Sequence, residues 1–155
     1  MKKSIQYNST DEKDTIRCGE QLARHLKVGD IVCLQGDLGS GKTTLVKGMA
    51  KGLGVSPQKV HSPTFVLMNI YKGKSPLYHF DFYRLDKVQE IPIIGYDEFL
   101  YGQGVAVIEW PERMGDLLPT ERLDIKLTHQ GENERRLEFY AVGKRAQQIL
   151  NHVTL

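Results

Sequence analysis

The chain has 155 residues, of which 40% are hydrophobic and 26% are charged, and its formal net charge is +2. This composition is ordinary for a globular protein, and the charge is too small to indicate a nucleic-acid-binding protein by itself. No apolar run reaches the ~20 residues that cross a bilayer, and the start of the chain lacks the apolar core of a secretory signal. Cys18 and Cys33 form no C-x-x-C pair. We therefore expect one cytoplasmic, reduced domain over residues 1–155.

The first third of the chain predicts strand, helix, strand and helix. Residues 4–7 suit a short edge strand, and Ser9 with Glu12 fits a capping box, with Ser9 as the cap. The helix that follows is expected to reach about Leu26 and to bury Ile16, Leu22, Ala23 and Leu26. The apolar run at 31–34 predicts a buried strand. A second helix is indicated by apolar residues at helical spacing: Leu45, Val46, Met49, Ala50 and Leu53, with Gly54 as the stop.

The segment at 36–43, which joins this strand to the second helix, matches G-x-x-x-x-G-K-[ST], the phosphate-binding loop of nucleotide hydrolases and kinases. Its glycines let backbone N–H groups approach phosphate oxygens. Lys42 supplies a positive charge for the outer phosphates, and the Thr43 hydroxyl suits Mg²⁺. The positive N-terminal end of the helix faces the same anion. The predicted nucleotide-binding residues are Asp37, Leu38, Gly39, Ser40, Gly41, Lys42, Thr43 and Thr44.

The rest of the chain predicts two hairpins around one more buried strand. The expected elements are strands at 64–71 and 77–81, a short helix at 96–101, a strand at 104–108, a second hairpin from 124–128 and 136–142, and a closing helix at 143–150. We therefore expect an α/β protein with a P-loop NTPase-like three-layer fold. Its central sheet is mixed and mainly parallel, with helices on both faces and antiparallel hairpins attached.

Two acids stand where a magnesium ligand is expected, at the ends of strands beside the phosphate loop. Glu109 follows the strongly apolar strand at 104–108, and we expect it on the metal, directly or through water. Asp81 follows the more polar strand at 77–80 and is expected to hold or activate the attacking water, or to anchor a metal-bound water. The alternatives are a solvated strand-end acid for Glu109 and a turn or cap carboxylate for Asp81. Trp110 is either a core residue or a reporter of nucleotide binding.

Further polar residues flank these positions. Ser62 and Thr64 suit a switch that senses the terminal phosphate, although a proline turn explains them as well. Arg84 either stabilises the transferring phosphoryl group or forms a surface ion pair with Asp86. His79 alternates with Asp81 and shares its face of the strand, where a lone histidine is more often structural.

The class of nucleotide protein is narrowed by missing motifs. No N-K-x-D segment reads guanine, and residues 81–84 lack the D-x-x-G of GTPase switches, so ATP is favoured over GTP. A P-loop small-molecule kinase remains the alternative, because the loop spacing suits that class too. Such kinases have an arginine-rich lid, whereas the clustered arginines here are Arg135 and Arg136 in a predicted strand.

Four motifs in order resemble those of the TsaE (YjeE) family: residues 36–44, Ser-Pro-Thr-Phe at 62–65, His-Phe-Asp-Phe-Tyr-Arg-Leu at 79–85, and Ile-Glu-Trp-Pro-Glu at 108–112. The resemblance runs from about residue 15 to residue 139. It implies a bacterial ATPase required for threonylcarbamoyladenosine formation in tRNA. The family works with the proteins TsaB and TsaD, so contact with tRNA is expected to be indirect.

By position, the resemblance implies ATP and Mg²⁺ as cofactors, with Lys42, Asp81 and Glu109 as the catalytic residues. Thr43 and Glu109 match the family's magnesium ligands, and Asp81 matches its Walker B-like aspartate. Residues 62–65 match a switch-like segment. Intrinsic hydrolysis is expected to be slow, because no residue is securely placed as an arginine finger. The adenine-binding residues are not identified, and the segment at 10–12 is a candidate.

Overall fold

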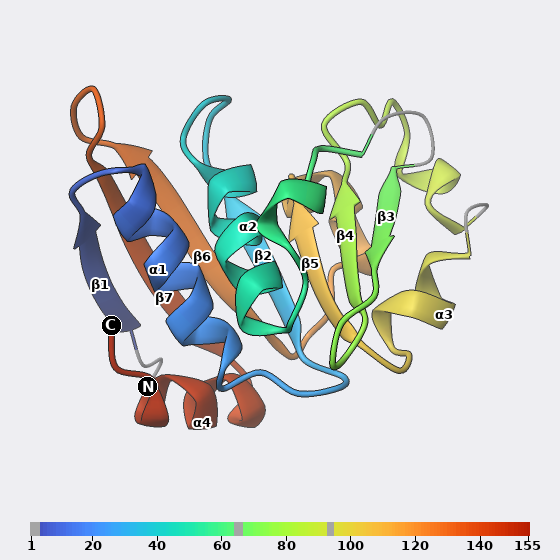
Figure 1. The fold of residues 1–155 in the computed structure, drawn as a ribbon. Helices are drawn as coiled ribbons and strands as arrows, with labels where there is room; N and C mark the ends of the chain where they lie inside the picture. Colours follow the sequence, from blue (N-terminus) through green and yellow to red (C-terminus); the bar gives the residue numbers. More distant parts are fainter. Residues whose placement is uncertain (1–3, 64–66, 93–94) are drawn as a thin grey trace.

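The structure, a computed structural model, describes residues 4–63, 67–92 and 95–155. Its strands are β1 (Ser4–Ser9), β2 (Ile31–Gln35), β3 (Met68–Tyr71), β4 (Leu77–Asp81), β5 (Val105–Glu109), β6 (Arg122–His129) and β7 (Arg135–Val142). They form one sheet in the order β1-β7-β6-β2-β5-β4-β3 (Figure 1). The central strands β6, β2, β5 and β4 are parallel, and β1–β7, β6–β7 and β3–β4 are antiparallel. The expected mixed sheet with two attached hairpins is confirmed.

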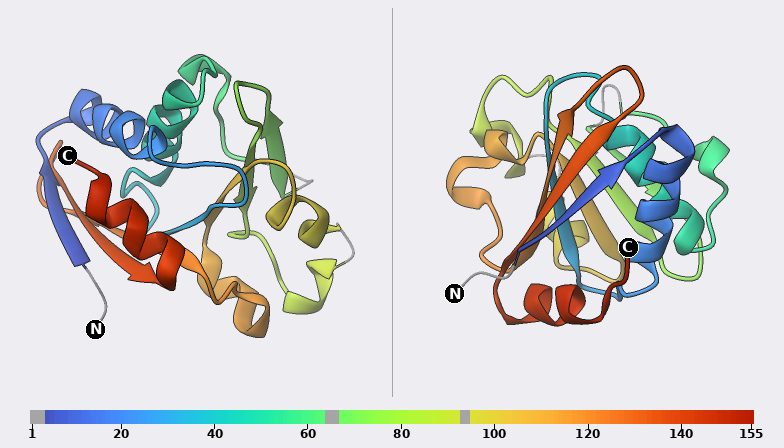
Figure 2. Two further views of the ribbon diagram at one scale, coloured as in Figure 1. Left: turned by 90° about the horizontal axis from the view of Figure 1, so that it is seen from below. Right: turned by 90° about the vertical axis from the view of Figure 1, so that its left-hand side faces the viewer.

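Helices lie on both faces of the sheet, as predicted. The helices are α1 (Glu12–Ala23), α2 (Lys42–Gly52), α3 (Tyr96–Leu100) and α4 (Lys144–His152), with 3-10 turns η1 (Pro57–Lys59), η2 (Val88–Glu90) and η4 (Pro111–Leu117). Figure 2 shows α1 and α2 over one face, and α3 with η2 and η4 over the other. In the described part of the chain, no helix has the length and apolarity needed to span a bilayer.

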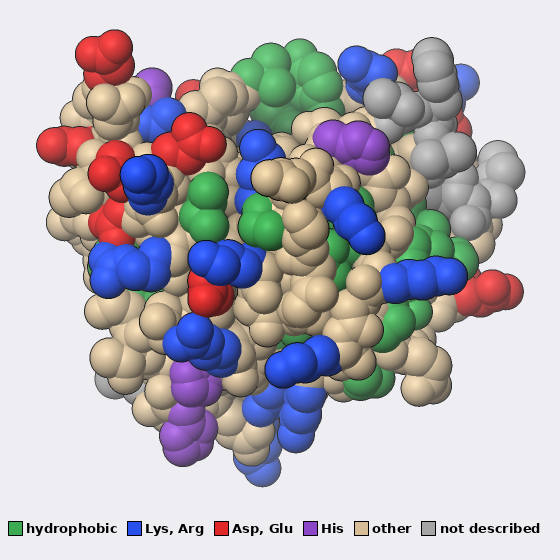
Figure 3. All heavy atoms as spheres, viewed as in Figure 1, with side chains coloured by type: hydrophobic (Ala, Val, Ile, Leu, Met, Phe, Trp, Pro, Cys, Tyr) green, Lys and Arg blue, Asp and Glu red, His purple; other side chains and the backbone are tan. Residues whose placement is uncertain are grey.

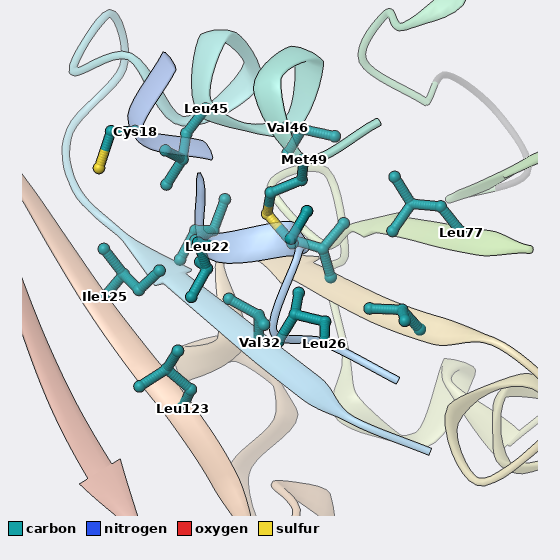
Figure 4. Packing of buried hydrophobic residues seen from close by; sticks show 14 of the residues in the cluster. Cys18, Leu22, Leu26, Val32, Leu45, Val46, Met49, Leu77, Leu123 and Ile125 are labelled. Atoms are coloured by element: carbon teal, nitrogen blue, oxygen red, sulfur yellow. The ribbon is translucent and has the colours of Figure 1, made fainter. Parts of the chain in front are cut away.

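Two apolar clusters, one on each face, hold these layers together. Figure 4 shows Leu22 of α1 and Met49 of α2 pointing toward Val32 of β2, and all three side chains are fully buried. Burying each such side chain contributes about 1.5–3 kcal/mol. The central strand β5 is buried along its whole length, which is why its sequence is a continuous apolar run and not an alternating one. This core fixes the carboxyl ends of β2, β4 and β5, where the predicted site lies.

The contact between α1 and α2 is made partly by backbone. A Cβ atom at Gly48 would lie 2.0 Å from the carbonyl oxygen of Ile16, and one at Gly19 would lie 2.5 Å from that of Leu45. Only glycine fits at these two positions, because real Cβ atoms do not approach backbone so closely. The two helices therefore touch without intervening side chains.

The predicted start of α1 is wrong by two residues. Its N-cap is Asp11, whose side chain accepts the Asp14 N–H at 2.7 Å, and not Ser9. Ser9 is the last residue of β1 and lies opposite Arg135 of β7 in the antiparallel ladder. The strand continues to Ser9 because β7 offers pairing partners that the local capping pattern does not reveal.

The predicted end of α1 is also wrong. The helix ends at Ala23, and the chain tightens into turns in which His25 N donates to the Leu22 carbonyl and Leu26 N donates to the Ala23 carbonyl. Leu26 is still buried, so its apolar spacing reflects burial beyond the helix. Ile16 is only partly buried, because Thr15 and Cys18 occupy the inward-facing positions instead.

The remaining elements follow the predictions closely. Strand β4 and the presence of both hairpins agree with the prediction. Strand β6 extends beyond the predicted range at both ends, β7 begins one residue earlier, and α3 ends one residue earlier. The predicted strand at 64–71 is described only from residue 67, and its described part is β3, Met68–Tyr71. Residues 64–66 of that prediction lie outside the described residues.

Candidate functional site

The phosphate-loop sequence joins β2 to α2, so the expected strand–loop–helix context is present. Gly36 has φ 151°, and Gly41, the N-cap of α2, has φ 104°. A Cβ at Gly36 would also lie 2.5 Å from Ser40 Oγ and 2.6 Å from the Leu127 carbonyl oxygen. The loop geometry therefore requires glycine at these points, and it aims the N-terminus of α2 into the space above the sheet.

A pocket of about 420 Å³ opens at this helix end. It is lined by the phosphate loop and by side chains from the ends of β4 and β5. The lining residues are Leu38, Gly39, Ser40, Gly41, Lys42, Thr43, Thr44, Ser62, Pro63, Leu67, Asp81, Tyr83, Arg84, Glu109, Trp110 and Arg135. The structure thus brings together every predicted site residue except Asp37, whose exposed side chain is not part of the lining.

Lys42 is buried in the loop that it belongs to. Its Nζ donates to the Gly36 carbonyl, donates to the Asp37 carbonyl at 3.2 Å, and lies 4.3 Å from the centre of the Trp110 ring. Burial lowers the pKa of the Lys42 ammonium, and the charges of Glu109 and Asp81 oppose this shift. The ammonium group is therefore held by weak partners that a more strongly charged acceptor can replace.

Thr43 and Glu109 meet at one wall of the pocket. Thr43 Oγ1 lies 3.2 Å from Glu109 Oε2 and 3.4 Å from Oε1, and it also lies 3.2 Å from Ser62 Oγ. Glu109 is almost fully buried, with 3% of its surface exposed. A hydroxyl and a carboxylate at this separation are ligands that Mg²⁺ accepts in proteins, where nucleotide phosphates and water supply the others.

Asp81 is the neighbour of Glu109 across the parallel β4–β5 pair. It is half-buried, and its Oδ1 accepts the Tyr83 N–H at 3.0 Å, which is the turn-capping contact weighed as an alternative for this residue. Burial raises the pKa of the Asp81 carboxyl; the Tyr83 hydrogen bond opposes that shift and the Glu109 charge adds to it. Asp81 also lines the pocket, so both interpretations apply to it.

Sequence reasoning missed two site residues. Arg135 lies against the phosphate loop, where its Nη2 is 3.4 Å from the Gly39 carbonyl oxygen. No local signal identifies it, because the β6–β7 register brings it there. His79, expected to be structural, is fully buried, and its Nε2 lies 2.5 Å from Glu109 Oε2. Its position two residues before Asp81 was the available signal.

The other polar residues that flank the predicted site have different positions in the structure. Ser62 reaches Thr43, whereas Thr64 lies outside the described residues. Arg84 lines the pocket, and the described ranges contain no ion pair between Arg84 and Asp86. Trp110 is only partly buried and has φ 59°, a rare value for a residue other than glycine. It lines the pocket and also packs against the second apolar cluster, so it belongs to both the site and the edge of the core.

The candidate adenine segment also lies near the loop. A smaller cavity of about 100 Å³ is lined by Glu12, Thr15, Gly41, Thr44, Asn133 and Arg135. Gly41, Thr44 and Arg135 belong to the main pocket as well, so the two spaces share one wall. Of the segment 10–12, only Glu12 lines this smaller space.

The charge around the site is uneven. The sequence has no Asp or Glu between Asp37 and Asp81, although this interval contains six lysines. Figure 3 shows Lys and Arg side chains spread over the face that α1 and α2 cover. Glu20, which lies on this face, pairs with Arg24 at 3.1 Å and with Lys51 at 3.3 Å. Of these six lysines only Lys42 lines the pocket, where the positive charges of Lys42, Arg84 and Arg135 stand beside two acids.

Comparison with known proteins identifies relatives of this chain. The family model "Threonylcarbamoyl adenosine biosynthesis protein TsaE" matches residues 9–137. The tRNA threonylcarbamoyladenosine biosynthesis protein TsaE of Bacillus subtilis is 39% identical over 153 residues, covering 98% of this chain and 95% of the relative. The Treponema pallidum protein of the same name is 43% identical over 129 residues, covering 83% and 95%.

A solved structure agrees as well. The crystal structure of YdiB from Bacillus subtilis superimposes with a TM-score of 0.81 at 36% identity, covering 97% of this chain and 94% of that one. The fold, the ordered motifs and the near-complete coverage all lead to one assignment. The chain belongs to the TsaE family of threonylcarbamoyladenosine biosynthesis proteins.

Proposed function

We propose that this chain binds ATP with Mg²⁺ at the phosphate loop and hydrolyses ATP slowly in support of threonylcarbamoyladenosine formation in tRNA. The observation that supports it most is the meeting of Thr43 and Glu109, 3.2 Å apart, in the pocket that also holds Lys42 and Asp81. These residues come from α2, β4 and β5, and only the folded chain assembles them.

The residues present fit a magnesium–nucleotide pair. The described part of the chain contains no group of three or more His, Cys, Asp or Glu side chains that could hold a metal alone. Magnesium in nucleotide sites needs only one or two protein ligands, because phosphates and water complete its shell. Ser40 Oγ, within the loop, is the one buried side-chain polar atom of the described residues without a hydrogen-bond partner. A phosphate oxygen is a suitable acceptor for it.

Each residue has a distinct task in this proposal. Lys42 turns from the carbonyls of the loop to the phosphates, and the N-terminus of α2 offers N–H groups to the same oxygens. Thr43 and Glu109 hold the metal, which when bound neutralises phosphate charge. Asp81, open to the pocket, orients the attacking water. Of the two arginines that line the pocket in the described structure, Arg84 is exposed and Arg135 contacts backbone carbonyl groups, so neither is fixed toward a reacting phosphate, and we expect slow hydrolysis.

We further propose that the chain works in the cytoplasm with the TsaB and TsaD proteins, and that its contact with tRNA is indirect. Leu38, at the tip of the phosphate loop, has 66% of its surface exposed, and Tyr83 has 40%. Both line the mouth of the pocket. Exposed apolar side chains beside a nucleotide site are suited to a protein partner that responds to the bound nucleotide.

Reconstitution tests this proposal. Purified TsaB and TsaD, tRNA and the remaining substrates are expected to give many rounds of modification only with this chain, ATP and Mg²⁺. Lys42→Ala should abolish that support, whereas Lys47→Ala, one turn further along α2, should retain it. Equal support by Lys42→Ala would refute the proposal. The kinase alternative predicts ATP consumption that depends on a small acceptor, and a screen of phosphoacceptors without such turnover excludes it.

A further inference from the structure

His79 belongs to a buried polar chain that the proposed hydrolysis does not use. Its Nε2 lies 2.5 Å from Glu109 Oε2, and its Nδ1 lies 3.1 Å from the Tyr71 hydroxyl. The Tyr71 hydroxyl in turn lies 3.0 Å from the His61 carbonyl oxygen and 3.3 Å from the His61 N–H nitrogen. Hydrogen bonds therefore connect the predicted magnesium ligand with the segment 61–63 on the rim of the pocket.

One arrangement of hydrogens pairs each of these groups, with the Asn69 amide, 3.0 Å from the His61 carbonyl oxygen, as the donor to that oxygen in place of Tyr71. When Nε2 of His79 bears the proton, His79 donates to Glu109 and its Nδ1 accepts from the Tyr71 hydroxyl. The Tyr71 oxygen then accepts from the His61 N–H and from the Asn69 side-chain amide, which lies 3.2 Å away. Buried polar networks that are fully paired fix the positions of their members, and breaking one bond leaves a buried group unpaired.

The hydrogen-bonded series of residues is closed into a ring by a second contact. Ser62, the residue after His61, lies 3.2 Å from Thr43 Oγ1, and Thr43 lies 3.2 Å from Glu109 Oε2. The result is a ring that runs Glu109, His79, Tyr71, His61–Ser62, Thr43 and back to Glu109. His79 and Tyr71 are 0% and 6% exposed, so water does not compete for their bonds.

We propose that His79 and Tyr71 are positioning residues that hold the Glu109 carboxylate toward Thr43 and link it to the segment 61–63. His79 occupies Oε2 of Glu109, which leaves Oε1 available to a cation. A cation bound between Thr43 and Glu109 then changes the position of Ser62. The change passes directly through Thr43 and also through His79 and Tyr71. This inference rests on the proposed magnesium–nucleotide site, and it predicts that binding there moves the segment 61–63 at the rim of the pocket.

Binding measurements with and without Mg²⁺ test the positioning role. Tyr71→Phe removes one hydroxyl and keeps the ring, and His79→Phe keeps a planar ring while removing both the donor for Glu109 and the acceptor for Tyr71. Both are expected to weaken Mg²⁺-dependent ATP binding about 10-fold, as loss of a ligand's supporting hydrogen bond does. Metal-free ATP binding should be unchanged. Tyr78→Phe is the matched control, because Tyr78 precedes His79 in β4 and is buried in the other apolar cluster.

A ligand-free measurement tests the link itself. Glu109→Gln is expected to shift the backbone amide resonance of His61, and most of that shift should be lost when Tyr71→Phe and Ser62→Ala are also present. Tyr78→Phe should not reduce it. No shift at His61, or an equal shift in every background, would overturn the link even if a variant binds ATP normally.

The two proposals fail in different ways. If the unaltered chain shows no Mg²⁺-dependent ATP binding, the proposed function fails, and the metal-dependent output of the ring fails with it. If the unaltered chain binds Mg²⁺–ATP and both variants bind it equally well, only the positioning role is overturned. Weaker binding with and without Mg²⁺ would indicate general loss of structure and would also count against positioning. Variants that bind as expected and retain the folded circular-dichroism spectrum support it.

Discussion

The ends of β4 and β5 carry the same chemical group in two different settings. Asp81 and Glu109 are direct neighbours across the parallel pair. Glu109 is buried, and its carboxylate meets side chains from two other elements, His79 and Thr43. The carboxylate of Asp81 is half-buried, and its hydrogen bond is to the backbone of the turn that follows it.

This difference in setting is the basis for assigning the two acids different tasks in the proposed nucleotide site. A carboxylate fixed by buried partners keeps one geometry, which suits a metal ligand. A carboxylate held from one side and open to the pocket on the other can turn toward a water molecule, which suits a group that orients the nucleophile. We therefore base the two proposed tasks on the surroundings of the strand ends, and not on the residue type.

The largest effect is expected from Glu109→Gln. Removing one member of a buried charged contact costs about 2–5 kcal/mol, so Mg²⁺-dependent ATP affinity should fall about 100-fold. Titration followed by the fluorescence of Trp110, the single tryptophan, measures this loss. Glu112→Gln, an exposed acid three residues later, is the control. A greater loss of affinity from Asp81→Asn than from Glu109→Gln would reverse the assignment.

Asp81→Asn should act on a different quantity. The amide keeps an acceptor for the Tyr83 N–H but loses the charge that faces water, so single-turnover hydrolysis should fall about 30-fold, or about 2 kcal/mol. The affinity for Mg²⁺–ATP should stay within about twofold of the original, because uniform binding is unaffected. Asp86→Asn in the same loop provides the comparison. Hydrolysis at the original rate would remove Asp81 from the mechanism.

A smaller effect is expected at the residue that bridges the two strand ends. Trp110 follows Glu109 directly, lies with its ring 5.0 Å from that of Tyr83, and covers the Lys42 ammonium. Trp110→Leu removes an ammonium–ring contact of about 0.5–1 kcal/mol and should change ATP affinity about threefold. Calorimetry measures the affinity, because the fluorescent group is gone. Tyr101→Leu, at an exposed aromatic residue far from the pocket lining, should change nothing.

The smallest effect is a change in the pH dependence of stability. Burial raises the pKa of Asp81 above its usual 3.8, so the ionised form destabilises the folded state. The favourable contribution of protonated Asp81 is complete below about pH 3.8 and is lost as pH rises through the folded-state pKa. Asp81→Asn should therefore gain stability relative to the original chain between about pH 4 and pH 7. Urea unfolding of both proteins at about pH 4 and at about pH 7 measures this difference. A variant that loses stability relative to the original chain over this range would contradict the prediction.

Much of the fold could be predicted because apolar runs and loop motifs are local. The strand at 105–109 and the loop at 36–43 are recognisable without tertiary information. The end of β1 could not be predicted, because Ser9 joins the strand through pairing with Arg135, 126 positions further along the chain. The 3-10 turns were missed as well, since such short segments have weak sequence patterns.

The site divides in the same way. Lys42, Thr43 and the two strand-end acids follow from motif and spacing, and the structure places them in one pocket. Arg135 reaches the loop only through the register of β6 and β7, which no local pattern fixes. The partners of His79 come from β3 and β5, so they could not be predicted from the residues next to His79 in the sequence. Sequence reasoning thus identified residues whose role depends on their own neighbours in the chain.

The glycine contact between α1 and α2 has a mechanical consequence. Because the backbones touch at Gly19 and Gly48, no side chain lies between the helices to be compressed or rotated. We therefore expect the two helices to move together, with the phosphate loop anchored through α1 to the N-terminal strand. A displacement caused by ligand binding cannot be absorbed at this joint. We expect it instead at the segment 61–63, which meets the loop through the Ser62–Thr43 side-chain contact and not through packed backbone.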